Sequence, residues 1–231
     1  MNFDLLNESG LNMQAVFNTA DLSEEIRRGH GELVGAYKQL ILIGHGGRQM
    51  WEAVQASSFA GSAEPIDSFS IDAVNRWFSK QLPNRRFETI YPESQQVIPL
   101  QRLGELAGWH NDSPFRIGIN EQWGSWFAYR AVVLSNSDLQ PTSKMGGPSP
   151  CDSCIEKPCI TACPADALSG KDTSLRNCIS YRMEGGSTCR DRCFSRIACP
   201  VASEHRYTMA QLNYHYTRSM QTIEAYYNRE N

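Results

Sequence analysis

The chain has 231 residues and a formal net charge of −3, and 20% of its residues are charged. This length suits one domain of good size, or one domain with a small appendage. The slight acidic balance argues against non-specific nucleic-acid binding, which needs a basic surplus, so we expect no nucleic-acid partner. The N-terminal residues carry early acids and no basic signal region, and the longest apolar run, near residue 40, is too short to span a bilayer. We therefore expect a cytoplasmic protein without membrane association.

Residues 1–140 show the patterns of a mixed α/β domain. The apolar segment 39–47 predicts a buried strand that runs into a glycine turn. A helix is predicted within 67–82, where Asp72 falls near the first turn and an apolar stripe follows. His45, next to the glycines, is expected to be an ordinary loop histidine.

The remainder of this domain alternates strands with one helix. Residues 86–91 predict a strand, and 97–109 predict a helix that ends at Gly108. Segments 116–120 and 125–136 predict two strands about a short turn. The second of these is rich in aromatic and β-branched residues, so we expect it to be central in its sheet.

The composition changes abruptly after residue 140. Residues 141–150 are rich in proline and glycine and predict a linker. Residues 151–205 form a cysteine module that lacks long apolar runs, so we expect it to depend on a metal for folding. Residues 206–231 predict a C-terminal helix. Its tyrosines suggest an interface with the first domain or with a second subunit of a homodimer: Tyr214, Tyr216, Tyr226 and Tyr227.

All eight cysteines lie between Cys151 and Cys199. In a reducing cytosol such a cluster is more typical of a metal site than of disulfides. The first group has the spacing C-x2-C-x4-C-x3-C-P, and the second group also ends in Cys-Pro. The bacterial ferredoxin run C-x2-C-x2-C-x3-C-P ends in the same way, and its fourth cysteine binds the other cluster. These features favour two 4Fe-4S clusters, with zinc as the alternative metal.

The ferredoxin pattern implies a crossed assignment of the ligands. Three closely spaced thiolates can cover one face of a cubane, and the next cysteine emerges on a short helix that points away, where a following proline is tolerated. The first cluster is predicted to bind Cys151, Cys154, Cys159 and Cys199. The second cluster is predicted to bind Cys163, Cys178, Cys189 and Cys193. A single cluster with spare cysteines is the other arrangement that the spacing allows.

Two further segments carry a resemblance to a known family. Residues 177–184 place Cys178 in a Cys-Ile-Ser-Tyr string, and residues 123–134 contain a Gly-Ser-Trp-Phe strand. Together with the order of the cysteines, they resemble epoxyqueuosine reductase, a cobalamin-dependent enzyme with two 4Fe-4S clusters. The same strand and residues 40–54 are similar to the cobalamin-processing (decyanase-like) proteins that remove the upper axial ligand of the vitamin. The resemblance implies an α+β protein, with a nitroreductase-like α/β domain followed by a small ferredoxin-like double-cluster module.

The resemblance also implies a cobalamin pocket against the Gly-Ser-Trp-Phe strand. Its residues would be Gly124, Ser125, Trp126, Phe127 and Tyr129. Glu93, in a Tyr-Pro-Glu-Ser string where the family has Val-Asp-Ser, is the candidate catalytic proton donor. FMN is the alternative cofactor, because the resembled core descends from flavin binders. Arg130, at the same strand, is expected to meet a surface acid.

The chain departs from the reductase family in two respects. The gap between Cys154 and Cys159 is longer, and the spacings that end at Cys193 and Cys199 differ from the family's. The reductase often carries a helical-repeat extension that grasps tRNA, whereas here one helix follows the cysteines. This difference disfavours a tRNA substrate more than it disfavours cobalamin.

The function expected from these features is electron relay. An external donor of the flavodoxin or ferredoxin type would reduce the clusters, and these would pass electrons to a bound cobalamin, for reduction of a small-molecule substrate or of the cobalamin itself. The alternatives are a ferredoxin-type electron carrier without cobalamin and a flavin-binding iron–sulfur reductase.

Overall fold

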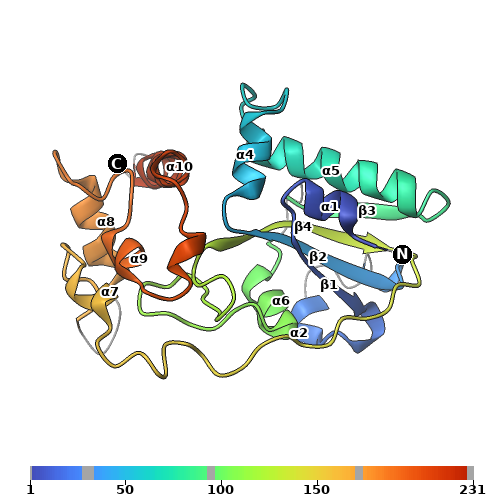
Figure 1. The fold of residues 1–231 in the computed structure, drawn as a ribbon, viewed down its shortest axis with the longest axis horizontal. Helices are drawn as coiled ribbons and strands as arrows, with labels where there is room; N and C mark the ends of the chain where they lie inside the picture. The colour runs from blue at the N-terminus through green and yellow to red at the C-terminus, as the bar shows by residue number, and fades with distance from the viewer. Residues whose placement is uncertain (1, 28–33, 93–96, 170–173, 228–231) are drawn as a thin grey trace. The chain divides into compact units, whose positions relative to one another are not determined.

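The computed structural model describes residues 2–27, 34–92, 97–169 and 174–227 (Figure 1). The chain divides into two compact units, each of which is described by itself below. No helix in the described part of the chain is both long enough and apolar enough to cross a bilayer.

The boundaries between the two units coincide with the domain boundaries predicted from the sequence only in part. Unit 1 comprises Met1–His110 and Phe127–Gly146, and unit 2 comprises Asn111–Trp126 and Gly147–Asn231. The later division, at Gly146, falls inside the predicted linker. Unit 2 combines the cysteine module with the C-terminal helix and with a segment that precedes the linker.

Unit 1 is built on a four-stranded antiparallel sheet with the strand order β1-β2-β4-β3. The strands are β1 (Met13–Asn18), β2 (Gln39–Gly46), β3 (Phe87–Tyr91) and β4 (Phe127–Ser135). β2 is buried at every position, which confirms the predicted buried strand. β4 lies between β2 and β3, which confirms that the aromatic strand is central.

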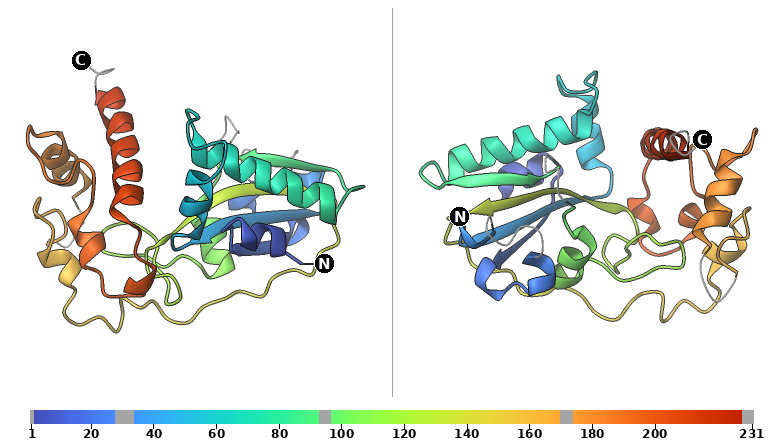
Figure 2. Two further views of the ribbon diagram at one scale, coloured as in Figure 1. Left: turned by 45° about the horizontal axis from the view of Figure 1, so that its top comes forward. Right: turned by 180° about the vertical axis from the view of Figure 1, so that it is seen from behind.

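Helices cover both faces of this sheet. They are α1 (Asp4–Glu8), α2 (Glu24–Arg27), α4 (Gln49–Gln55), α5 (Pro65–Gln81) and α6 (Leu100–Ala107), with a short 3-10 turn at Thr19–Asp21. Figures 1 and 2 show α1 and α5 on one face of the sheet and α2 and α6 on the other. The core beneath α5 contains Trp77 and Phe78, which are 0% and 1% exposed.

The prediction that a helix ends at Gly108 is confirmed. Gly108 follows α6 with a φ of 77°. A side chain there would place its Cβ 1.4 Å from the backbone oxygen of Met145, so only glycine fits both the backbone conformation and the space.

Two predictions about secondary structure are wrong: the position at which α5 begins, and the strand expected at 116–120. α5 begins at Pro65, well before Asp72, because a proline in the first turn and Asp67 beside it suit a helix N-terminus. Segment 116–120 is not a strand of the sheet and forms only isolated bridges at Ile119 and Asn120. Arg116 has a φ of 62°, which interrupts the extended backbone that a strand requires.

Unit 2 consists of short helices and turns. The helices are α7 (Pro158–Thr161), α8 (Leu175–Met183), α9 (Phe194–Ala198) and α10 (Met209–Tyr227), with a 3-10 turn at Ser203–His205. A small hydrophobic cluster joins Trp126, Tyr207 and Leu212, and Ile197 and Tyr216 pack against it. The protein is therefore a mixed α+β protein, as predicted, and the ferredoxin-like character of unit 2 stays a prediction.

Candidate metal centre

The cysteines lie in turns and at short helices of unit 2. Cys159 lies within α7, Cys178 within α8, and Cys193 and Cys199 flank α9 at its two ends. Short helices separated by turns allow thiols that are distant in sequence to face one another.

The two Cys-Pro endings are followed by the same backbone turn. Asp166, three residues after Cys163, has a φ of 48°, and Ala202, three residues after Cys199, has a φ of 47°. Left-handed backbone is unfavourable for residues other than glycine, so its repetition after both Cys-Pro pairs marks a turn that the surrounding structure imposes.

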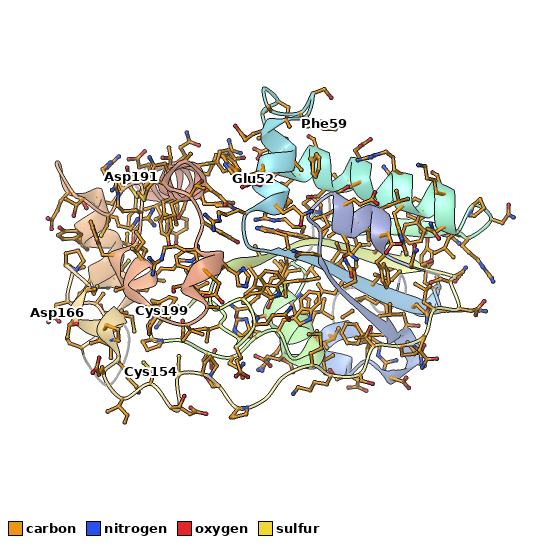
Figure 3. The ribbon with its side chains drawn as sticks, viewed as in Figure 1. Glu52, Phe59, Cys154, Asp166, Asp191 and Cys199 are labelled. Atoms are coloured by element: carbon orange, nitrogen blue, oxygen red, sulfur yellow. The ribbon has the colours of Figure 1, made fainter. Side chains whose placement is uncertain are left out.

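The first predicted set of cysteines is brought together in space. Burial raises the pKa of Cys151 and of Cys159, and the charge of the nearby Cys199 raises both further. Burial also raises the pKa of Cys199, and Cys154 adds to that rise while the Val201 backbone amide opposes it. Figure 3 labels Cys154 and Cys199, which come from opposite ends of the cysteine module.

The second predicted set is also brought together. Burial raises the pKa of Cys178, and it raises that of Cys189 to about 11; the charge of Cys193 raises both further, and Cys163 acts in the same direction. All four of these cysteines line one cavity of about 170 Å³. These neighbour relations are consistent with the crossed assignment, which stays a prediction together with ligation itself.

The cavity of the second set has a wall of cationic and aromatic side chains. Arg182 and Arg192 line it together with Tyr181, Phe194 and Tyr216. Cations beside sulfur stabilise the thiolate form, which is the form that binds metal. Burial has the larger influence on Cys178 and raises the pKa of its thiol, so a bound metal would displace the proton of that thiol.

The donor set determines which metal group fits. Among the residues that the structure describes, no group of three or more Cys, His, Asp or Glu side chains is placed to hold a metal ion. Four thiolates on one zinc ion lie about 3.8 Å apart, given a Zn–S distance of about 2.3 Å. A cubane cluster spreads its four thiolates around a larger body. Two sets of four cysteines, one of them lining a cavity, would suit two 4Fe-4S clusters, which stay a prediction.

The five residues of the predicted cobalamin pocket fall in both units: Gly124, Ser125 and Trp126 in unit 2, and Phe127 and Tyr129 in unit 1. In unit 2, a side chain at Gly124 would meet the Val201 backbone oxygen at 2.3 Å, and the φ there is 57°. Trp126 is 0% exposed, and its ring packs against Tyr207 and beneath the Arg196 guanidinium, 4.7 Å away.

The two unit 1 residues of that pocket have contacts of their own. Phe127 is 6% exposed. The Tyr129 ring stacks on Trp109 at 6.4 Å, and its hydroxyl lies 3.2 Å from His110 Nδ1. Burial raises the pKa of Tyr129, and the charge of Glu105 adds to the rise. The structure accounts for these side chains by packing within each unit, and cobalamin binding by them stays a prediction.

Two expectations about polar residues of unit 1 are wrong. His45 is not a loop residue, because it lies in β2 and is 0% exposed. Its Nδ1 accepts a hydrogen bond from Arg130 Nε at 2.9 Å, so among the described residues Arg130 meets a buried histidine and not a surface acid. Glu93 lies outside the described residues, so its role as proton donor stays a prediction.

Sequence reasoning did not identify the two arginines that organise unit 2. Arg182 Nε donates to the Cys189 backbone oxygen at 3.2 Å, and its other nitrogens donate to Ser219 Oγ and the Tyr216 backbone oxygen, each at 3.1 Å. Arg196 donates to the Ser125 backbone oxygen. Cysteine spacing carries no information about these contacts. The position of Arg196 between Cys193 and Cys199, two predicted ligands, could have indicated that this arginine lies near a metal site.

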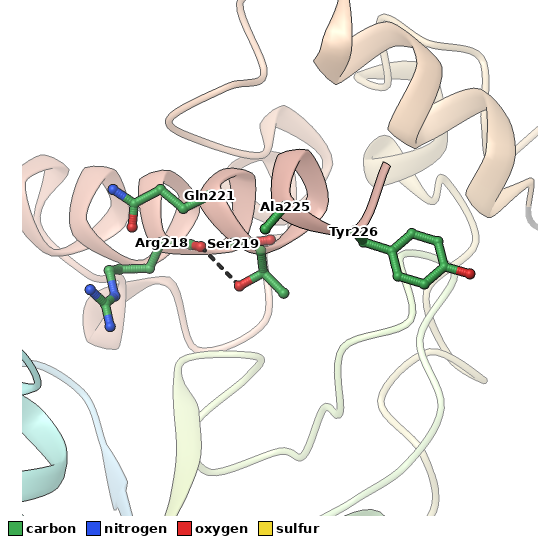
Figure 4. A pocket seen from close by; sticks show the side chains of 6 residues that line it. Arg218, Ser219, Gln221, Ala225 and Tyr226 are labelled. Atoms are coloured by element: carbon green, nitrogen blue, oxygen red, sulfur yellow. Dashed lines mark hydrogen bonds between the residues drawn. The ribbon is translucent and has the colours of Figure 1, made fainter. Parts of the chain in front are cut away.

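The tyrosine-rich helix α10 presents a second, open pocket of about 590 Å³ (Figure 4). Arg218, Gln221 and Tyr226 lie along it, and Thr222 Oγ1 donates to the Arg218 backbone oxygen at 3.2 Å. Tyr226 is 59% exposed. The interface predicted for this helix stays a prediction.

Comparisons with known proteins agree with this architecture. No family model matches the chain, and no curated protein matches it in sequence. Among solved structures, it is similar to epoxyqueuosine reductase from Streptococcus thermophilus, with 16% identity, a TM-score of 0.51, and coverage of 87% of this chain and 66% of that one. The enzyme from Bacillus subtilis has 13% identity and a TM-score of 0.52, with coverage of 89% of this chain and 66% of that one.

Two further structures are similar. An epoxyqueuosine reductase with an epoxyqueuosine-modified tRNA stem loop gives 13% identity, a TM-score of 0.54, and coverage of 91% and 67%. A B12-trafficking protein from C. elegans has 14% identity and a TM-score of 0.48, with coverage of 88% of this chain and 84% of that one. The chain spans 66% of the length of the first two reductases. The likeness to the three reductases establishes the fold alone, so the resemblance drawn from the cysteine order and the Gly-Ser-Trp-Phe strand is confirmed at that level.

Proposed function

We propose that this chain is an iron–sulfur redox protein that relays electrons through two 4Fe-4S clusters to a bound cobalamin, for reduction of a substrate or of the cobalamin itself. The observation that carries the proposal is that Cys163, Cys178, Cys189 and Cys193 line one cavity, while Cys199 lies close enough to Cys151 and Cys159 to raise the pKa of both. The order of the cysteines along the chain and the reductase-like fold support it.

Each set would hold one cluster, and each cluster would accept and release one electron. The protein's part is to bury the sulfurs and to aim hydrogen-bond donors at them. The backbone amide of Val201 opposes the burial effect on Cys199, and that of Phe194 opposes it on Cys189. Such amides and the exclusion of water set the potential at which a cluster takes up an electron.

Cobalamin as the electron acceptor is supported by the fold, since the similar structures include epoxyqueuosine reductases. The proposed pocket residues are Gly124, Ser125, Trp126, Phe127 and Tyr129, and Glu93 is the proposed proton donor. FMN is the alternative cofactor. The proposed electron donor is an external protein of the flavodoxin or ferredoxin type, and the proposed location is the cytoplasm.

The test begins with anaerobic purification and counting of iron and sulfide. The proposal expects about eight irons per chain, four for each cluster. Cys154→Ser and Cys178→Ser, which each remove one ligand from a different set, should each reduce the count toward about four. Zinc in place of iron would refute the redox proposal.

A titration of the iron-loaded protein with cob(II)alamin, followed by visible and EPR spectra, then tests the acceptor. A shift to base-off cobalt would support the cobalamin proposal. Eight irons without a spectral response to cobalamin, but with one to FMN, would identify a flavin-binding reductase. Eight irons with no response to either would identify a ferredoxin-type electron carrier.

A further inference from the structure

The cavity of the second cysteine set contains one hydroxyl that is not explained by folding. The side-chain oxygen of Tyr216 is buried and has no hydrogen-bond partner among the described residues by distance and angle, although Arg196 and Cys193 are its neighbours. Leaving a buried hydroxyl without a partner costs about 1–3 kcal/mol, so a partner among the groups that line or fill the cavity is expected.

Tyr216 is held in place from several sides. The Arg182 guanidinium lies 5.5 Å from the centre of its ring, and Arg182 Nη2 donates to its backbone oxygen at 3.1 Å. The same arginine donates to the Cys189 backbone oxygen at 3.2 Å, which ties α10 to the turn that carries a ligand. The ring also packs against the cluster of Trp126, Tyr207 and Leu212.

Tyr216 and Cys193 line the same cavity. Burial raises the pKa of Tyr216, and the neighbouring Cys193 adds to the rise, whereas Arg196 opposes it. A protonated phenol next to a thiolate is a hydrogen-bond donor with an acceptor at hand.

We propose that the Tyr216 hydroxyl donates a hydrogen bond to the sulfur of the second cluster at Cys193 and thereby raises the reduction potential of that cluster. This inference rests on the proposed function, since it requires the cluster. In the step concerned, an external reductant such as dithionite gives one electron to the cluster. No bond forms or breaks, and the tyrosine keeps its proton. The added negative charge on the sulfurs strengthens the hydrogen bond, so the donor stabilises the reduced state more than the oxidised state.

The experiment compares the reduction potentials of both clusters in the full-length, iron-loaded protein, by EPR-monitored anaerobic titration. Tyr216→Phe removes the hydroxyl and keeps the ring. We expect the equilibrium constant for reduction of the second cluster to fall about tenfold, which is about 59 mV for a one-electron couple, and that of the first cluster to stay unchanged. Cys154→Ser, which removes a ligand of the first set, identifies which signal belongs to the second cluster.

Tyr181→Phe is the matched control, because Tyr181 lines the same cavity but its hydroxyl lies 3.4 Å from Thr188 Oγ1. We expect it to leave both potentials unchanged. If Tyr216→Phe retains the iron but leaves the second potential unchanged, or if it shifts no more than Tyr181→Phe, the hydrogen-bond inference is refuted and the proposed function stands. If the wild-type protein itself binds no iron, the proposed function fails, and the iron count makes the two failures distinguishable.

Discussion

Unit 1 and unit 2 are stabilised in different ways. In the described part of unit 1, buried polar side chains find partners in the protein: His45 meets Arg130, and Ser70 Oγ donates to the Ile66 backbone oxygen at 2.7 Å. In unit 2, several buried atoms lack a hydrogen-bond partner among the described residues, including Ser125 Oγ and both side-chain amide atoms of Gln211.

The backbone shows the same contrast. Among the described residues, the non-glycine positions with positive φ all lie in unit 2: Arg116, Lys157, Asp166 and Ala202. Unit 1 covers a twisted sheet with helices and is held by apolar burial. Unit 2 bends its chain around two groups of sulfurs with a small apolar core, so bound metal is expected to supply much of its folding free energy. The following predictions test this difference, from the largest expected effect to the smallest.

Removal of iron should disorder unit 2 and leave unit 1 folded. Chelation of iron under oxidising conditions would remove the clusters that we propose α7 and α9 hold, while the β2–β4 pairing needs no metal. Hydrogen–deuterium exchange should therefore show protection lost in α7, α9 and α10 and retained in β2 and β4. Equal loss of protection in both units would contradict the contrast.

Trp77→Ala should destabilise unit 1 by about 3–5 kcal/mol, whether or not iron is bound. Trp77 is 0% exposed, stacks on Phe3 at 5.1 Å, and donates from Nε1 to the Asn2 backbone oxygen at 3.1 Å. Urea unfolding followed by far-UV circular dichroism measures the change. Val97→Ala, at a side chain that is 90% exposed, is the control and should stay within about 0.5 kcal/mol of wild type.

Ala202→Gly should stabilise unit 2 by roughly 0.5–1 kcal/mol. Ala202 has a φ of 47°, which glycine adopts without the steric cost of a Cβ, although glycine also gains freedom in the unfolded chain. Ala225→Gly, on the exposed side of helix α10, should have the opposite sign and cost about 1 kcal/mol. Thermal unfolding of the iron-loaded protein compares the two variants. If both substitutions shift the melting temperature in the same direction, the strain inferred at Ala202 is contradicted.

The smallest effect concerns pH and a surface carboxylate of unit 1. A hydrogen bond from Lys38, at 2.8 Å, and the charge of Arg85 hold the pKa of Asp138 below its ordinary value. Because the folded pKa is lowered, this contribution to stability is present above the ordinary Asp pKa of about 4 and is lost as the pH falls below it. Asp138→Asn should flatten that part of the profile of melting temperature against pH. An unchanged profile would show that the pair contributes nothing measurable.

Local sequence patterns alone were enough to predict much of the secondary structure of unit 1. A continuous apolar run predicted β2, aromatic and β-branched residues predicted β4, and a glycine after an amphipathic stretch predicted the end of α6. These features depend on neighbours within a few residues, so the sequence contains the whole cause. The crossed grouping of the cysteines came from the ferredoxin pattern and not from spacing alone, and it stays a prediction.

The errors and omissions have a different cause. Segment 116–120 has a strand-like composition but no strand partner in the described sheet, and its backbone turns at Arg116. His45 was assigned to a loop because glycines surround it, whereas pairing with β4 continues β2 through it to Gly46.

What the sequence by itself determined is the main strands and the order of the cysteines on which the proposed ligand chemistry rests, since both follow from residue type and short spacing. Only the tertiary structure decided that Arg182 and Tyr216, 34 positions apart, meet at one cavity. Such contacts depend on how α8 and α10 pack, and packing sums many weak interactions that no local pattern records.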